Sequence, residues 1–144
     1  MNDPGFHALL TSCHLRLVGT PLGRPEATGE WLYEDAPFGL LAHDASPDPL
    51  FTYANRTAQR CFEYGWEEFV GMPSRLSALP GSRESRQELL DAVAGDGYAT
   101  GYRGLRVAKS GRRFWVEDLT MWNLLGADGA LVGQAAAFHR WRDA

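Results

Sequence analysis

The chain has 144 residues, of which 44% are hydrophobic and 22% are charged, and its formal net charge is −4 with a pI of about 5.5. This length and composition indicate one soluble globular domain, and they exclude disorder as the default state. The net negative charge differs from the positive charge that is typical of nucleic-acid-binding proteins. No apolar run reaches the roughly 20 residues that span a bilayer. We therefore expect a cytoplasmic protein with no nucleic-acid or membrane partner.

The N-terminal part of the chain is predicted to form an amphipathic helix followed by a connector. Apolar residues ahead of Gly19 follow helical spacing, and this glycine provides a stop. The segment 20–28 is rich in proline and glycine, which is typical of a connector. The sequence thus divides into residues 1–29, which hold a tail, the helix and the connector, and residues 30–144, which form the main domain.

The main domain is predicted to begin with a hairpin and a group of helices. Short apolar runs at 37–43 and 50–54 flank a segment rich in Asp, Ser and Pro, which must turn. Asn55 then stands in an N-cap position for a helix over 56–64. Residues 82–94 show capping-box spacing and one apolar face, so they predict a longer helix.

Three further strands are predicted to follow. Two β-prone runs within residues 98–123 flank the turn Lys109-Ser110-Gly111-Arg112, and a third run spans 131–141. Neither arm of the first pair contains a proline, so both fit inside a sheet. The order of elements predicts an α+β fold, a five-stranded antiparallel sheet with helices on one face and an extra N-terminal helix.

Several motifs in fixed order resemble the MEKHLA domain, a branch of the PAS superfamily. They are Leu50-Phe-Thr-Tyr-Ala-Asn55, residues 59–63, Pro73-Ser-Arg-Leu-Ser-Ala78, Gly111-Arg-Arg-Phe114, Met121-Trp-Asn-Leu124 and Gly133-Gln-Ala-Ala136, and the resemblance spans about residues 30–141. It implies a PAS-like fold and a sensory or regulatory role, with a small ligand held between the sheet and the helices. PAS modules often pair with a copy of themselves, so we expect a homodimer that signals to a separate output protein of unknown identity.

The resemblance also allows two known PAS cofactors to be tested against the residues. Flavin-binding photosensory PAS domains are similar over Lys109–Trp115, but Ser74 stands where their adduct-forming cysteine would be. Arg106 and Val116 stand where two flavin-facing amides would be. Haem-binding PAS domains use a histidine on the longer helix, and residues 82–94 contain none. We expect neither flavin nor haem nor a metal, and the cofactor is unknown.

A ligand site is predicted from strand alternation and from polar residues near the cleft. Alternation places Val116, Asp118 and Trp122 on one side of the sheet, and Arg106 on the neighbouring strand faces the same side. Arg106, with Arg75, is a candidate for binding an anionic group on a small metabolite, because a guanidinium matches a carboxylate. The other interpretation is a buried Arg–Asp pair that only fixes the register. The candidate ligand-binding residues are Tyr53, Asn55, Ser74, Arg75, Arg106, Val116, Asp118 and Trp122.

The opposite side of the same strand is predicted to carry Trp115 and Leu119. Such an apolar face needs a cover, which either the N-terminal helix or a second copy of the chain would supply.

An enzyme is not expected, because the sequence shows no nucleophile elbow, phosphate loop or metal dyad. Two functions stay open. One is a sensor that binds a small ligand, and the other is a protein-interaction or dimerisation module with a filled core and no ligand.

Overall fold

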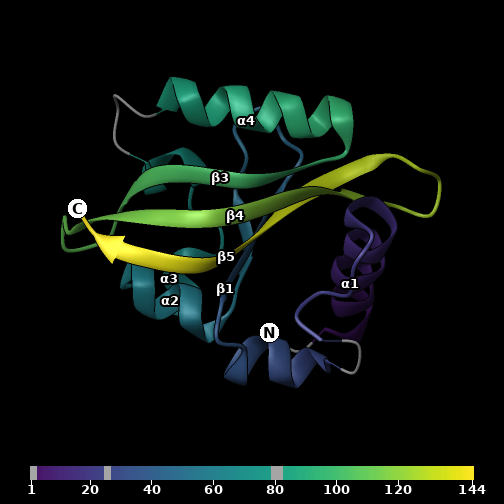
Figure 1. The fold of residues 1–144 in the computed structure, drawn as a ribbon, viewed down its shortest axis with the longest axis horizontal. Coiled ribbons are helices and arrows are strands. Elements are labelled where there is room, and N and C mark those ends of the chain that lie inside the picture. The colour runs from purple at the N-terminus through teal and green to yellow at the C-terminus, as the bar shows by residue number, and fades with distance from the viewer. Residues whose placement is uncertain (1–2, 25–26, 79–82) are drawn as a thin grey trace.

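The computed structural model describes residues 3–24, 27–78 and 83–144, which form a five-stranded sheet with helices around it (Figure 1). All neighbouring strands are antiparallel, in the order β2-β1-β5-β4-β3. The strands are β1 (Gly39–Asp44), β2 (Phe51–Ala54), β3 (Tyr98–Val107), β4 (Arg113–Leu125) and β5 (Leu131–Asp143). The fold class predicted from the sequence is confirmed.

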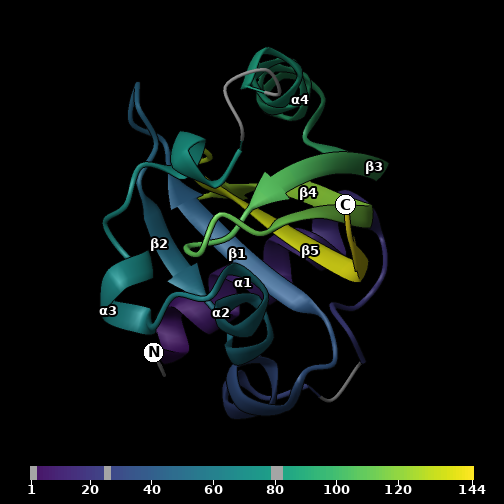
Figure 2. The same cartoon turned by 90° about the vertical axis from the view of Figure 1, so that its left-hand side faces the viewer.

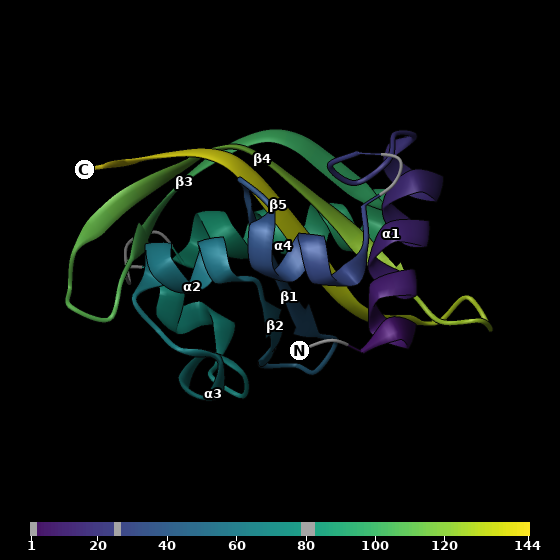
Figure 3. The ribbon, with the colours of Figure 1, turned by 90° about the horizontal axis from the view of Figure 1, so that it is seen from below.

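The helices fall into two groups. Figure 1 shows α4 running alongside β3, and Figure 2 shows the same helix end-on. Helix α1 lies apart from α2 and α3 and packs against β4 (Figure 3). The helical elements are α1 (Pro4–Val18), the π-helical turn η1 (Trp31–Asp35), α2 (Arg56–Phe62), α3 (Trp66–Phe69), the 3₁₀ turn η2 (Ser74–Ser77) and α4 (Arg83–Asp96).

Local capping explains where the first helices begin. The Asp3 carboxylate accepts hydrogen bonds from the backbone N–H groups of Gly5 and Phe6, so α1 starts at Pro4, two residues earlier than predicted. Asn55 caps α2 as predicted, because its side-chain oxygen accepts from the N–H of Ala58 at 3.0 Å.

The longer helix α4 differs from the prediction at its end. It continues through Gly95 to Asp96, and Gly97 follows it with a positive φ of 96°. The predicted cap Ser82 lies outside the described residues.

The sheet carries a core on each face. The helix-side core joins α2, α3 and α4 to the sheet, and the ring of Phe62 meets those of Phe69, Phe114 and Phe138 at centroid distances of 5.5, 5.0 and 6.3 Å. The outer core lies on the other face, under α1 and η1. Its buried members include Leu10, Cys13, Leu32, Tyr33, Phe38, Leu40, Tyr53, Trp122 and Leu124.

A backbone irregularity at Asp118 shifts the side-chain alternation of β4. Asp118 is exposed and has a φ of 54°. The pairing of β4 with β3 shifts by one residue between Val116 and Leu119, so the side chains that follow take the opposite faces. The prediction that Asp118 and Trp122 lie on the side of Val116 is therefore wrong. For the same reason Leu119 lies in the helix-side core with Val116, not on the opposite face as predicted.

Candidate functional site

A small cavity lies between the sheet and α4, where the resemblance implied a ligand. Its volume is about 40 Å³, which is the share of one or two water molecules in the liquid. Its polar lining comes from five elements: His43 of β1, Ser77 of η2, Arg86 of α4, Arg106 of β3 and Gln134 of β5.

Arg106 is the charged residue that the sequence analysis placed in this cleft, and the structure confirms that placement. Its side chain is buried, with 7% of the residue exposed, and one guanidinium nitrogen donates to the carbonyl oxygen of Leu105 at 3.0 Å. Burial lowers the pKa of Arg106, and the nearby Tyr102 opposes that change.

The predicted Arg–Asp pair is not formed, because the Asp118 side chain is exposed. None of the carboxylates in the described part of the chain lies within 4.0 Å of the Arg106 guanidinium. The register interpretation of Arg106 is therefore wrong.

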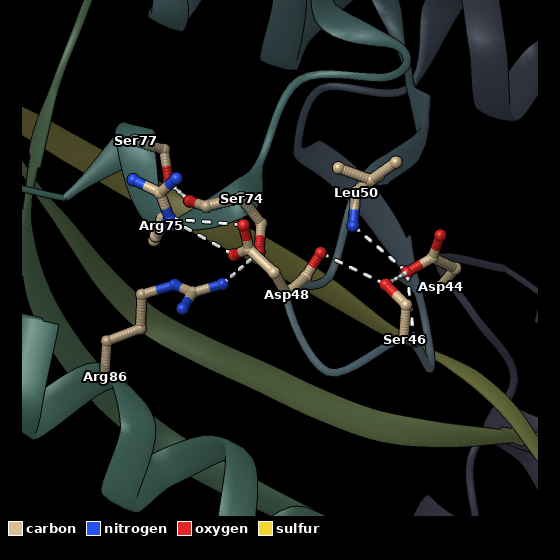
Figure 4. Close-up of polar contacts among 8 residues, drawn as sticks. All are labelled: Asp44, Ser46, Asp48, Leu50, Ser74, Arg75, Ser77 and Arg86. Carbon is tan, nitrogen blue, oxygen red and sulfur yellow. Dashed lines mark hydrogen bonds and ion pairs between the residues drawn. The ribbon is translucent and has the colours of Figure 1, made fainter.

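A second buried arginine, Arg86, reaches the cavity from α4. It donates a hydrogen bond to the hydroxyl of Ser74, as Figure 4 shows. Arg75 had been predicted for this role, but its side chain is exposed and binds Asp48, with Nε and Oδ1 3.2 Å apart. Sequence reasoning missed Arg86 although a signal existed, because it lies three and four residues ahead of Leu89 and Leu90 on the apolar side of α4.

His43 and Gln134 are register partners on the adjacent strands β1 and β5. The Gln134 amide donates to the carbonyl oxygen of Leu90 at 3.2 Å and to the side-chain oxygen of Asn123 at 3.1 Å, so it ties α4 and β4 to β5. His43 is buried, and its Nδ1 bonds the carbonyl oxygen of Asp44 at 2.8 Å.

A wider cavity of about 220 Å³ opens on the other side of His43 and Gln134, which line both spaces. The loop between β1 and β2 forms one wall. Its shape is held by Asp44, whose carboxylate accepts from the Ser46 hydroxyl at 2.6 Å and from the Leu50 N–H at 3.0 Å (Figure 4). Because the two spaces share His43 and Gln134 as lining residues, we call the smaller one the inner chamber and the wider one the outer mouth of the cleft.

The other predicted site residues lie outside this cleft. Tyr53 belongs to the outer core, where it lines a cavity of about 310 Å³ beneath α1, and burial raises its pKa. Trp122 is also in the outer core, and its indole Nε1 donates to the carbonyl oxygen of Leu10 at 3.3 Å. Asn55 is fully buried and bonds only backbone groups among the described residues.

Two predicted residues do lie at or next to the cleft. Arg106 lines the chamber, and Ser74 accepts a hydrogen bond from a chamber residue. Val116 packs in the helix-side core but does not line the chamber.

The cleft does not fit the flavin of photosensory PAS domains. A chamber of about 40 Å³ is far smaller than the roughly 300 Å³ or more of typical organic-ligand pockets. The described residues contain no group of three or more His, Cys, Asp or Glu side chains that could hold a metal ion. No helix in the described ranges is long and apolar enough to cross a membrane.

Comparison with solved structures gives PAS-type folds. The PAS domain of a protein from Colwellia psychrerythraea matches with a TM-score of 0.63 at 22% identity, covering 75% of this chain and 86% of that one. An RNA-binding light-oxygen-voltage receptor matches with a TM-score of 0.66 at 19% identity, covering 86% of this chain and 36% of that one. A light-oxygen-voltage domain studied with a flavin analogue gives 0.59 at 20% identity, covering 74% of this chain and 76% of that one. At these identities the similarity shows the fold alone.

Sequence comparison supplies the family. No curated protein matches the chain. The model of the MEKHLA domain, by contrast, matches residues 5–143, which include all of α1 except Pro4 and every strand of the sheet. Together with the PAS-type order of the strands, this match over nearly the whole chain shows that the protein belongs to the MEKHLA domain family.

Proposed function

We propose that this domain is a cytoplasmic sensory or regulatory module, not an enzyme, which binds a small anionic ligand between the sheet and α4. The observation that supports the proposal is the buried guanidinium of Arg106 at the wall of a cavity, with no carboxylate of the described residues within 4.0 Å. Arginine stays protonated even when burial lowers its pKa. An isolated buried charge costs several kcal/mol, and an anion in the cavity would offset that cost.

The position of Arg86 suggests how binding would be transmitted. Arg86 belongs to α4 and Arg106 to β3, and both line the same chamber. An anion between them would attract α4 toward the sheet, so that occupancy changes the position or stability of α4. We propose that this change is read by protein partners, the first of which is a second copy of the chain.

The anion site is tested by removing the Arg106 charge. Replacement by methionine keeps an unbranched side chain but removes every hydrogen-bond donor. Titration calorimetry with sodium acetate at constant ionic strength should give at least tenfold weaker binding for Arg106→Met than for the wild type, because hydrogen bonds to charged groups are worth about 1.5–3 kcal/mol. Without ligand, Arg106→Met should be as stable as the wild type or more stable, since an uncompensated buried charge has been replaced by an apolar group.

Arg75→Gln is the matched control, because Arg75 is exposed and its ion pair with Asp48 lies outside the chamber. Acetate affinity should be the same in this variant as in the wild type. Equal acetate binding by wild type and Arg106→Met, or no binding by the wild type, contradicts the proposed site.

A second function is favoured by the packing of the helix-side core. The ring of Phe62 meets three other phenylalanine rings, and the chamber of about 40 Å³ holds only a very small group. A protein-interaction or dimerisation module with a filled core would show this packing. In that case the wild type would bind no acetate, while removal of the Arg106 charge would still leave a folded protein.

A further inference from the structure

His43 presents an unsatisfied hydrogen-bond acceptor inside the cleft. A carbonyl oxygen can only accept, so the 2.8 Å contact with Asp44 places the ring proton on Nδ1 and leaves Nε2 as a bare acceptor in the neutral ring. The neutral form is favoured because burial lowers the pKa of His43, and the positive charge of Arg86 acts in the same direction. Only 6% of His43 is exposed, and its Nε2 has no partner among the residues that the structure describes.

The location of His43 says which part of a ligand would meet this acceptor. His43 lines both the inner chamber and the outer mouth of about 220 Å³. The chamber has room for about one carboxylate group, since its volume is that of one or two water molecules. Since His43 lines both spaces, a larger molecule whose anionic group lies beside Arg106 would pass His43 if it extends toward the mouth.

We infer that the ligand is a small hydroxycarboxylate, and that the ring of His43 selects it by accepting a hydrogen bond from the hydroxyl group. The inference rests on the proposed anion site, because the carboxylate is the group assigned to Arg106. The hydroxyl lies on a carbon next to the carboxylate, which is the part of the molecule that passes His43. The rest of the ligand occupies the mouth, between α4 and the loop that follows β1.

The loop at the mouth is held in place by contacts that leave His43 in its present orientation. The backbone carbonyl of Asp44 accepts the hydrogen bond from Nδ1 of His43. The carboxylate of Asp44 is engaged elsewhere, because it accepts from Ser46 and Leu50. Asp48 of the same loop pairs with Arg75 of η2 (Figure 4). The acceptor is thus fixed before a ligand arrives, and such preorganisation improves selectivity.

The test compares acids that differ only by a hydroxyl group. Glycolate and acetate form one such pair, and lactate and propionate form a second. In titration calorimetry of the full chain at pH 7.5, we expect the wild type to bind each hydroxy acid at least about tenfold more tightly than its partner, since a site built to bond a hydroxyl rejects the analogue that lacks it. In His43→Phe the preference should fall below about twofold, because the phenyl ring offers no acceptor to the hydroxyl group.

Two further variants separate selection from folding. His43→Gln retains an acceptor oxygen on a side chain of similar reach, and it should keep part of the preference. His139→Phe alters an exposed histidine and should change neither affinity. Equal binding of glycolate and acetate by the wild type overturns the inference but leaves the anion site standing, as does an unchanged preference in His43→Phe. If none of the four acids binds the wild type, the anion site fails and the inference fails with it.

Discussion

The side chain of Asn55 joins segments that are far apart in the sequence. Its oxygen accepts from the N–H groups of Leu40 and Ala58, both at 3.0 Å. Its nitrogen donates to the carbonyl oxygens of Leu32 at 2.9 Å and Phe38 at 3.0 Å. An asparagine amide offers two donors and two acceptor lone pairs, so all four are in use. Asn55 is therefore a structural residue that holds η1, β1 and the start of α2 together.

Replacing Asn55 by alanine should destabilise the domain strongly. Each buried backbone group left without a partner costs about 1–3 kcal/mol, so we expect a loss of about 3–5 kcal/mol in the free energy of unfolding, measured by urea titration at pH 7. Asn123→Ala is the control, because the Asn123 side chain makes one donated bond to the Ala94 carbonyl at 3.3 Å and one accepted bond from Gln134 at 3.1 Å. Its cost should be about 1–2 kcal/mol. Similar small losses in both variants would contradict the structural role.

Among the elements, α1 determines how the outer core is closed. Leu10 is only 1% exposed, and the backbone carbonyl of the same residue accepts from the buried indole of Trp122. The ring of His14 meets the same indole edge-on at a centroid distance of 4.7 Å. The packing of α1 therefore contributes to the stability of the sheet.

A pair of leucines on α1 tests this contribution. Leu10→Ala should lower the free energy of unfolding by about 2–5 kcal/mol, because the buried side chain leaves a cavity. Leu15→Ala changes a leucine that is 53% exposed on the same helix, and its cost should stay within about 0.5 kcal/mol. If the two variants unfold at the same urea concentration, α1 is not packed on the sheet as described.

The positions of most elements could be predicted from the sequence, but the face of each side chain on β4 could not. Apolar spacing, capping residues and the turn at 109–112 are local signals, and they gave the order of strands and helices correctly. The irregularity at Asp118 has no such signal, because aspartate adopts positive φ only occasionally and tertiary contacts decide where. One such residue was enough to move Trp122 from the predicted cleft to the outer core.

The candidate site was predicted in part for related reasons. To place Arg106 in the cleft, it was enough to know which side chains of β3 face the helices. The predicted position of Arg106 is confirmed, because its side chain lines the chamber. The prediction that Arg75 is the second arginine of the site is wrong, because its side chain is exposed and pairs with Asp48. A position in a short irregular segment near the cleft does not determine whether a side chain points inward. Arg86 was the better choice on periodicity, since a charged residue on the apolar side of a helix is either paired or functional.

At the scale of the whole molecule, α1 covers only one end of the outer face. Figures 1 and 3 show α1 and the C-terminus at opposite ends of the sheet. Toward the C-terminal end, Arg103 lies over the ring of Trp115 at 3.8 Å, and Glu117 pairs with Arg103 at 3.5 Å and with Arg142 at 3.0 Å. We define these four residues, with the half-buried Leu105 and Val107, as the outer strip.

The outer strip is suited to a second copy of the chain because it carries both charges beside an apolar centre. In a two-fold dimer, the arginines of one strip could exchange Glu117 partners with the other strip while the Trp115 rings are buried. Sedimentation equilibrium should therefore find a dimer, and Trp115→Gln should raise its dissociation constant about 30-fold, as expected when an interface tryptophan contributes about 2 kcal/mol.

Trp141→Gln is the control, since Trp141 is 38% exposed but lies on the helix side near Thr57 and Cys61. A monomeric wild type, or equal weakening by both substitutions, would mean that this face is not the interface. The signal that we propose for the cleft would then have to pass through α4 to an unrelated partner.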